Sequence, residues 1–302
     1  MKRTRNSNPA MKTIGVFDSG FGGLTVLRAL LPLIPDARYI YLGDTARLPY
    51  GSKSQETIAR YAVSSANFLA AQGADLLVIA CNTATALALD DIRAAVSIPV
   101  VGVIQPGAEA ALAASQELPS RSKHRAAERP ASLQTPTQPH VLVLATAATT
   151  QSGAYTRALN TLGLRATEKA CPLLVPLVEE NWLEEPAQRS VTLDVLRIYL
   201  LEALAQAPDA STLLLGCTHY PLLKPLIETT LRNLHHPMRI IDSAEATACA
   251  VVTELIREPP APVSASPNCT FYATDSIEKF QRLGSAFLGR PLPPVRLINL
   301  GG

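Results

Sequence analysis

Short runs of apolar residues alternate along this chain with longer segments in which apolar residues recur at helical spacing. Strands are predicted at residues 13–17, 38–44, 75–80 and 98–104, with helices at 24–34, 54–73 and 83–96. The strand segments are continuously apolar, which is typical of parallel strands covered on both faces. The same alternation resumes at residue 140 and continues to about 289. The pattern therefore predicts an α/β protein with mainly parallel sheets.

The two halves of this pattern resemble each other. In each half an early strand ends in small polar residues, at 17–20 and at 145–150, and a later strand ends in a cysteine, Cys81 or Cys217. Ligands of open α/β sheets bind outside the carboxyl ends of the strands. We therefore expect two pseudo-symmetric, doubly wound domains that face each other, with both cysteines in the cleft between them.

Two segments depart from the pattern. Residues 115–138 are rich in proline, serine and charge and have almost no apolar period, which predicts a flexible insertion loop. Residues 1–10 read as a loose N-terminal extension, and Met11 is an alternative start. Neither segment carries a candidate functional residue.

Composition narrows the class of protein. The chain has 302 residues, 47% of them hydrophobic, and 27 basic against 25 acidic residues. A net charge of +2 argues against a nucleic-acid partner. No apolar run approaches the roughly 18 residues of a membrane span, and the basic start has no signal-peptide core. Five cysteines, an odd number, fit a reducing compartment, so we expect a cytoplasmic protein without a membrane partner.

Cys81 and Cys217 each follow a strand and precede a helix start, where backbone N–H groups and the helix dipole stabilise a thiolate. They are too far apart in sequence for a redox C-x-x-C motif, and a zinc site would need more ligands than the sequence offers, so no metal is expected. A single nucleophile, Cys217 with His219 as its base, leaves Cys81 unexplained. Two thiols on opposite faces of one carbon could instead remove and return a proton, which inverts a stereocentre.

A cysteine can also serve only as a small buried hydrophobic residue. That interpretation suits Cys171, Cys249 and Cys269 better than Cys81 and Cys217. A second alternative rests on the glycine-rich turn at 15–27, followed by Asp44 at the end of the next strand, which imitates a dinucleotide site. Thr25 occupies the place of the third glycine, and Asp18 in the turn would repel a pyrophosphate. A non-catalytic or nucleotide-binding α/β protein nevertheless remains an alternative.

Six stretches in order along the chain carry a resemblance to the glutamate racemases of the cofactor-independent aspartate/glutamate racemase superfamily. They are IGVFDSGFGGLTVL, YLGDTARLPYGSKS, IACNTATA, VGVIQPGAEAA, CPLLVPLVEE and LLGCTHYPLL. The resemblance implies one α/β domain at 12–105 plus 224–290 and a second at 106–223, with the active site between them. It implies conversion of L-glutamate to D-glutamate without a cofactor, which supplies peptidoglycan synthesis in cell-wall biogenesis and so maintains cell shape. The oligomeric state stays open, with a homodimer as one option.

The resemblance also implies roles for individual residues. Cys81 and Cys217 resemble the catalytic acid/bases, with Asp18 assisting the first and His219 the second. Glu179 resembles a further active-site carboxylate, although its neighbour Glu180 is an alternative. The residues that resemble the substrate cradle are Asp18, Ser19, Pro49, Tyr50, Gly51, Asn82, Thr83, Thr146, Thr149, Thr218 and His219. Relatives that act on aspartate tend to carry an acid at the position of His219, and an aspartate-type racemase is a third alternative.

Overall fold

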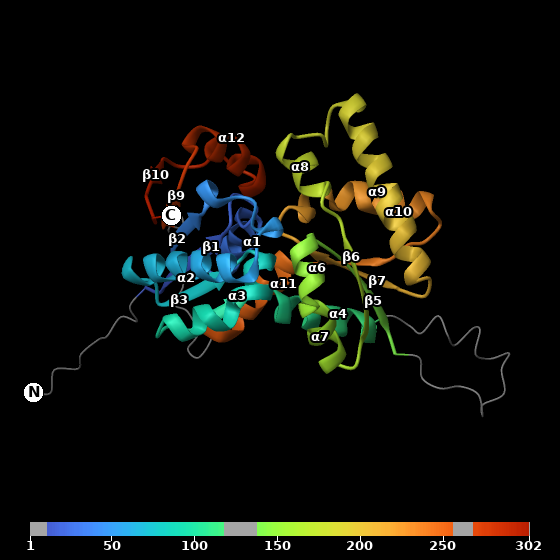
Figure 1. Cartoon of the computed structure of the whole chain (residues 1–302), viewed down its shortest axis with the longest axis horizontal. Coiled ribbons are helices and arrows are strands. Elements are labelled where there is room, and N and C mark those ends of the chain that lie inside the picture. Colours follow the sequence, from blue (N-terminus) through green and yellow to red (C-terminus); the bar gives the residue numbers. More distant parts are fainter. Residues whose placement is uncertain (1–10, 118–137, 256–267, 302) are drawn as a thin grey trace, which may run out of the picture.

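The computed structural model describes residues 11–117, 138–255 and 268–301. Its strands form two sheets, and every strand pairing in the described residues is parallel. The first sheet has the order β10-β9-β2-β1-β3-β4 and the second the order β6-β5-β7-β8 (Figure 1). An α/β fold with two parallel sheets is therefore confirmed.

The first sheet is built from both ends of the chain. Its strands are β1 Thr13–Asp18, β2 Arg38–Gly43, β3 Leu76–Ile79, β4 Val100–Gly102, β9 Asn268–Ala273 and β10 Val295–Leu297. The helices that accompany them are α1 Leu24–Leu33, α2 Gln55–Ala71, α3 Asn82–Ala95, α11 Ser243–Leu255 and α12 Ile277–Leu288. Two short 3₁₀ segments, η1 Thr45–Arg47 and η2 Tyr50–Ser52, lie in the connection from β2 to α2.

The second sheet uses the middle of the chain. Its strands are β5 His140–Ala145, β6 Arg165–Ala170, β7 Thr212–Gly216 and β8 Arg239–Asp242. Its helices are α4 Ile104–Glu117, α6 Ala147–Ser152, α7 Ala154–Thr161, α8 Leu174–Glu179, α9 Pro186–Gln206 and α10 Lys224–Asn233, with the 3₁₀ segment η4 Tyr220–Leu223. Figure 1 shows the two sheets side by side, each with helices packed on it.

The continuous apolar runs are buried because both faces of each sheet are covered. In β3, Leu76 and Val78 point into one core cluster, whereas Leu77 and Ile79 point into another on the opposite face. This is the side-chain alternation of a strand, applied to a strand with no solvent face. The first of these clusters also contains Leu215 of β7, so the two sheets share one apolar core.

Local signals in the sequence explain the helix ends. The Ser54 hydroxyl accepts a hydrogen bond from the Thr57 N–H at 3.4 Å, as expected of an N-cap. At the other end of α2, Gly73 has φ of +86°, a left-handed conformation that glycine adopts without strain. Helix α2 is therefore present as predicted, but it ends at Ala71 with Gln72 as its C-cap, slightly inside the predicted range 54–73.

Sheet membership differs from the expected domain boundary at residue 224. Strand β8 pairs with β7, with Leu213 beside Ile240, and α10 packs on α9. The chain returns toward the first sheet only through α11, which packs against α1 and α4. The reason is that a parallel strand is reached most simply by a crossover helix to its neighbour, so α10 leads to the next strand of the same sheet.

The predicted insertion is also shorter than expected at its start, because residues 115–117 form the last turn of α4. Residues 118–137 of that predicted loop and the predicted extension 1–10 lie outside the described residues.

Candidate active site

Both cysteines lie where a strand of their sheet ends. Cys81 follows β3 and caps α3, since its Sγ accepts a hydrogen bond from the Ala84 N–H at 3.4 Å. Cys217 follows β7 and precedes η4. The exposed fractions are 5% for Cys81 and 6% for Cys217, so both thiols are almost fully withdrawn from solvent.

The glycine-rich turn after β1 brings the two strand ends together. A Cβ built on Gly22 would lie 2.2 Å from Thr218 Oγ1 and 2.7 Å from His219 Nδ1, so only glycine fits there. The Thr25 hydroxyl donates to the Thr218 carbonyl at 3.1 Å. The turn of the first sheet therefore contacts the Cys217 segment of the second sheet directly, which explains the glycine without a bound nucleotide.

The surroundings of Cys81 are acidic and buried. Its thiol donates to Ser19 Oγ at 3.5 Å. Burial first, and then the Asp18 carboxylate and Cys217, raise the pKa of the Cys81 thiol to about 12, although the hydrogen bonds with Ser19 and the Ala84 N–H oppose the shift. The Cys81 thiol is therefore kept in its protonated form at neutral pH.

Asp18 is itself buried, and its Oδ2 accepts from the Gly20 N–H at 2.8 Å. Its Oδ1 has no hydrogen-bond partner among the described residues. Burial raises the pKa of the Asp18 carboxyl, although the positive His219 and the backbone N–H groups of Gly20, Gly23 and Ser19 oppose the shift. An unpaired buried oxygen next to a buried thiol is a site where a polar ligand group would be accommodated.

Cys217 has a basic neighbour instead. The His219 Nδ1 lies 3.9 Å from Cys217 Sγ, and the His219 Nε2 lies 3.2 Å from Glu179 Oε1. Burial alone would lower the pKa of His219, but its contacts with Cys217 and Glu179 outweigh burial and raise that pKa to about 10. The ring packs edge-on against Phe287 with centroids 5.0 Å apart.

A lysine extends the row of contacts that runs from Cys217 through His219 to Glu179. Lys279 Nζ of α12 lies 3.3 Å from Glu179 Oε2, so Glu179 bridges His219 and Lys279. Burial tends to raise the pKa of Glu179, yet the two cationic neighbours lower it overall. Glu180, the alternative left open by the sequence, is exposed. Of the two acids, the structure places only Glu179 in contact with the site.

Three predicted hydroxyls form one cluster. Thr83 Oγ1 at the start of α3 lies 3.0 Å from Thr146 Oγ1 and 3.2 Å from Thr149 Oγ1, and the last two are 3.0 Å apart. Thr146 and Thr149 belong to the second sheet's half of the site, so the cluster joins both halves. Hydroxyls can donate to a carboxylate, and the N–H groups at the start of α3 add further donors.

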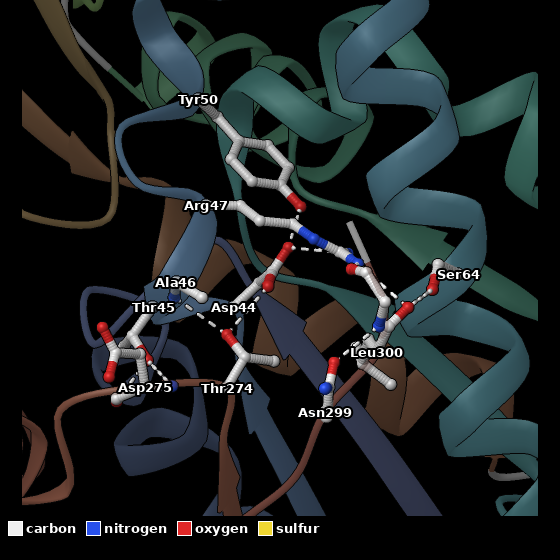
Figure 2. Close-up of polar contacts among 11 residues, drawn as sticks. Asp44, Thr45, Ala46, Arg47, Tyr50, Ser64, Thr274, Asp275, Asn299 and Leu300 are labelled. Atoms are coloured by element: carbon white, nitrogen blue, oxygen red, sulfur yellow. Dashed lines mark hydrogen bonds and ion pairs between the residues drawn. The ribbon is translucent and has the colours of Figure 1, made fainter.

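The three predicted cradle residues at 49–51 differ in how they are placed. Pro49 is exposed and Gly51 faces Thr146, with a built Cβ only 3.3 Å from the threonine Cβ. The Tyr50 side chain is buried and its hydroxyl donates to Asp44 Oδ2 at 2.6 Å (Figure 2). Tyr50 could therefore reach a ligand only through its backbone.

Sequence reasoning missed Tyr155, whose hydroxyl donates to Asn82 Oδ1 at 2.6 Å. The Asn82 Nδ2 has no partner among the described residues. Asp44 lies with 0% of its surface exposed, and its oxygens are occupied by Tyr50, Thr274 and Arg47. It is not available to a ribose, which removes the main support for the nucleotide-binding alternative.

Within residues 11–117, 138–255 and 268–301 no group of three or more histidine, cysteine or acidic residues is placed to hold a metal ion. The helices in that same part of the chain are all too short or too polar to cross a bilayer. A cavity of about 480 Å³, lined among others by Asp90, Arg93 and Arg157, contains none of the predicted site residues.

A family model described as Asp/Glu/Hydantoin racemase matches residues 24–251. The chain belongs to the Asp/Glu/hydantoin racemase family, and it is an isomerase of the racemase class.

Individual relatives cover nearly the whole chain. A glutamate racemase of Koribacter versatilis is 46% identical over 312 residues, which cover 96% of this chain and 98% of the relative. The crystal structure of glutamate racemase from Thermus thermophilus in complex with β-chloro-D-alanine is 38% identical and superimposes with a TM-score of 0.77, covering 96% and 97% of the two chains. That of Francisella tularensis in complex with D-glutamate is 30% identical with a TM-score of 0.79, covering 96% and 98%.

Proposed function

We propose that this protein interconverts L- and D-glutamate without a cofactor, by proton transfer at Cα between Cys81 and Cys217. The observation that carries the proposal is the pair of buried thiols at strand ends of the two sheets, linked by the turn after β1, in which Ser19 contacts Cys81 and Gly22 lies against Thr218 and His219. In this proposal the two sheets with their helices act as two domains that enclose the substrate. D-glutamate would then serve peptidoglycan synthesis in the cytoplasm.

The two thiols differ in their companions. His219 next to Cys217 stabilises a thiolate, which takes the Cα proton from one enantiomer. Cys81 next to Asp18 stays a thiol, which delivers a proton to the opposite face. Breaking the Cα–H bond leaves an electron pair on Cα, and the new bond to the Cys81 proton consumes it. The charge that develops between these steps is stabilised by nearby hydrogen-bond donors.

The substrate follows from the relatives and the cradle. Glutamate racemases cover nearly all of this chain at 38–46% identity. The hydroxyl cluster of Thr83, Thr146 and Thr149 and the unpaired amide of Asn82 supply donors for carboxylate groups. An aspartate-type racemase remains the competing substrate assignment, and assays with both amino acids distinguish the two.

The test uses L-glutamate in deuterated water with no added pyridoxal phosphate or metal. We expect D-glutamate that carries deuterium at Cα. The C81S and C217S variants should each lower the racemisation rate by about 10²–10⁴-fold, the usual contribution of general acid–base catalysis. C249S is the matched control, because Cys249 is exposed on α11. The C249S variant should racemise glutamate at the parent rate. A C81S/C217S double variant with full activity would refute the proposal.

A further inference from the structure

The connection that follows β2 is held by the C-terminal chain. The Thr274 hydroxyl donates to Asp44 Oδ1 at 2.9 Å and accepts from the Ala46 N–H at 2.9 Å. Thr45 and Asp275 exchange two hydrogen bonds of 2.6 Å and 2.9 Å. The start of this connection is therefore fixed to the end of β9.

The last described residues hold the same connection from another side. Arg47 Nη2 donates to the carbonyl oxygens of Leu300, at 3.1 Å, and of Gly301, while its Nη1 lies 3.3 Å from Asp44 Oδ2. Figure 2 shows the guanidinium between Asp44 and Leu300. The Ser64 hydroxyl of α2 also donates to the Leu300 carbonyl, at 3.4 Å. One arginine thus connects a buried carboxylate to the end of the chain.

This series of contacts leads to the substrate site. Asp44 accepts the Tyr50 hydroxyl at 2.6 Å, and Gly51, the next residue, faces Thr146 of the hydroxyl cluster. Asp44 is therefore linked through the Tyr50 side chain to the segment 49–51, which the family resemblance assigns to the substrate cradle. The family model ends at residue 251, well before the C-terminal residues that make these contacts.

We propose that the C-terminal residues 299–301 position the substrate loop 49–51 through Arg47 and Asp44, which makes Arg47 a positioning residue for substrate binding. The inference rests on the proposed function. An arginine suits this role because its planar guanidinium has donors on two sides, whereas a lysine offers one compact ammonium group.

The test compares R47K with R60K in the full chain. Arg60 is the matched control, because its guanidinium lies 5.3 Å from the Tyr61 ring, on which Arg47 also stacks at 4.5 Å. Among the described residues Arg60 donates to neither Asp44 nor the C-terminal carbonyls. We expect R47K to raise KM for glutamate about five- to tenfold, the size of effect that the loss of one typical hydrogen bond produces. Its kcat should stay within about twofold, because lost positioning of this kind weakens binding uniformly.

A chain shortened to end at Ile298 should reproduce the KM increase, with folding checked by circular dichroism. If R47K had the same KM for glutamate as the control R60K, the inference would be overturned. So would a lower melting temperature with an unchanged KM, because it would show that the C-terminal residues only stabilise the fold. If the parent protein did not racemise glutamate, the proposed function would fail instead. Thermal stabilisation by D-glutamate, compared between parent and R47K, would then still test the loop.

Discussion

Replacing Glu179 by glutamine tests how the site keeps His219 charged beside Cys217. Glutamine has nearly the same shape, and its amide oxygen can still accept from the His219 Nε2, which lies 3.2 Å from Glu179 Oε1. The negative charge is lost, and with it the ion pair to Lys279 at 3.3 Å. The substitution therefore changes the electrostatics of the site more than its geometry.

The expected magnitude follows from the pKa of His219, which burial alone would lower but which Cys217 and Glu179 together raise from 6.5 to about 10. That difference corresponds to roughly 5 kcal/mol at 1.36 kcal/mol per pH unit. If Glu179 supplies between a third and a half, the pKa of His219 falls by about 1–2 pH units in E179Q. Because the parent pKa is raised, the stability from protonated His219 is fully present below pH 6.5 and is lost as pH rises through about 10. In E179Q that loss occurs at lower pH.

The assay measures kcat/KM for glutamate from pH 6 to 11, since this quantity reports the pKa values of the free enzyme. In E179Q the alkaline limb should move down by about 1–2 pH units, so that the loss of activity relative to the parent is about two- to tenfold greater at pH 9 than at pH 7. E180Q removes the neighbouring exposed carboxylate and should keep the parent profile. If E179Q and E180Q gave the same profile, Glu179 would not hold the charge of His219 and the reasoning would be wrong.

Two further predictions concern contacts between the halves of the site. G22A should lose about 1–3 kcal/mol of stability and much of the activity, because its Cβ would lie 2.2 Å from Thr218 Oγ1. Thermal unfolding compares it with G107A, where the nearest side-chain atoms are 3.6 Å away, and equal losses in both would contradict the clash. Y155F should cost about 1–3 kcal/mol in urea unfolding, because it leaves the buried Asn82 Oδ1 without its donor. An unchanged urea midpoint would mean that the amide finds another partner.

The apolar pattern predicted most of the strands, because a strand covered on both faces must be apolar throughout. The sheet to which a strand belongs is a tertiary property that this pattern does not contain. Strand β8 has the same kind of sequence as the strands of the first sheet, and only its pairing with β7 assigns it to the second. The short helix α8 has little signal in the sequence, because six residues give too little helical periodicity.

The residues of the candidate site also fall into those that the sequence could predict and those that it could not. The positions of Cys81 and Cys217 could be anticipated, because the carboxyl ends of parallel strands meet at one edge. Arg47 and Lys279 could not, since each looks like an ordinary charged surface residue. Their partners lie 253 residues away for Arg47 and Leu300, and 100 residues away for Lys279 and Glu179. Such pairs exist only in the folded chain.

The two cysteines lie in opposite electrostatic surroundings, and this difference bears on the proposed mechanism. Burial and the Asp18 carboxylate keep Cys81 protonated up to about pH 12. His219, whose pKa is raised to about 10, carries a positive charge at neutral pH, and its Nδ1 lies 3.9 Å from Cys217 Sγ. The proposed mechanism therefore places the thiol on Cys81 and the thiolate on Cys217, beside the charged His219. Two-base racemisation needs this mixed state, because two thiols could not remove a proton and two thiolates could not return one. The asymmetry between the Asp18 side and the His219 side thus supports the mixed state that the proposed mechanism requires.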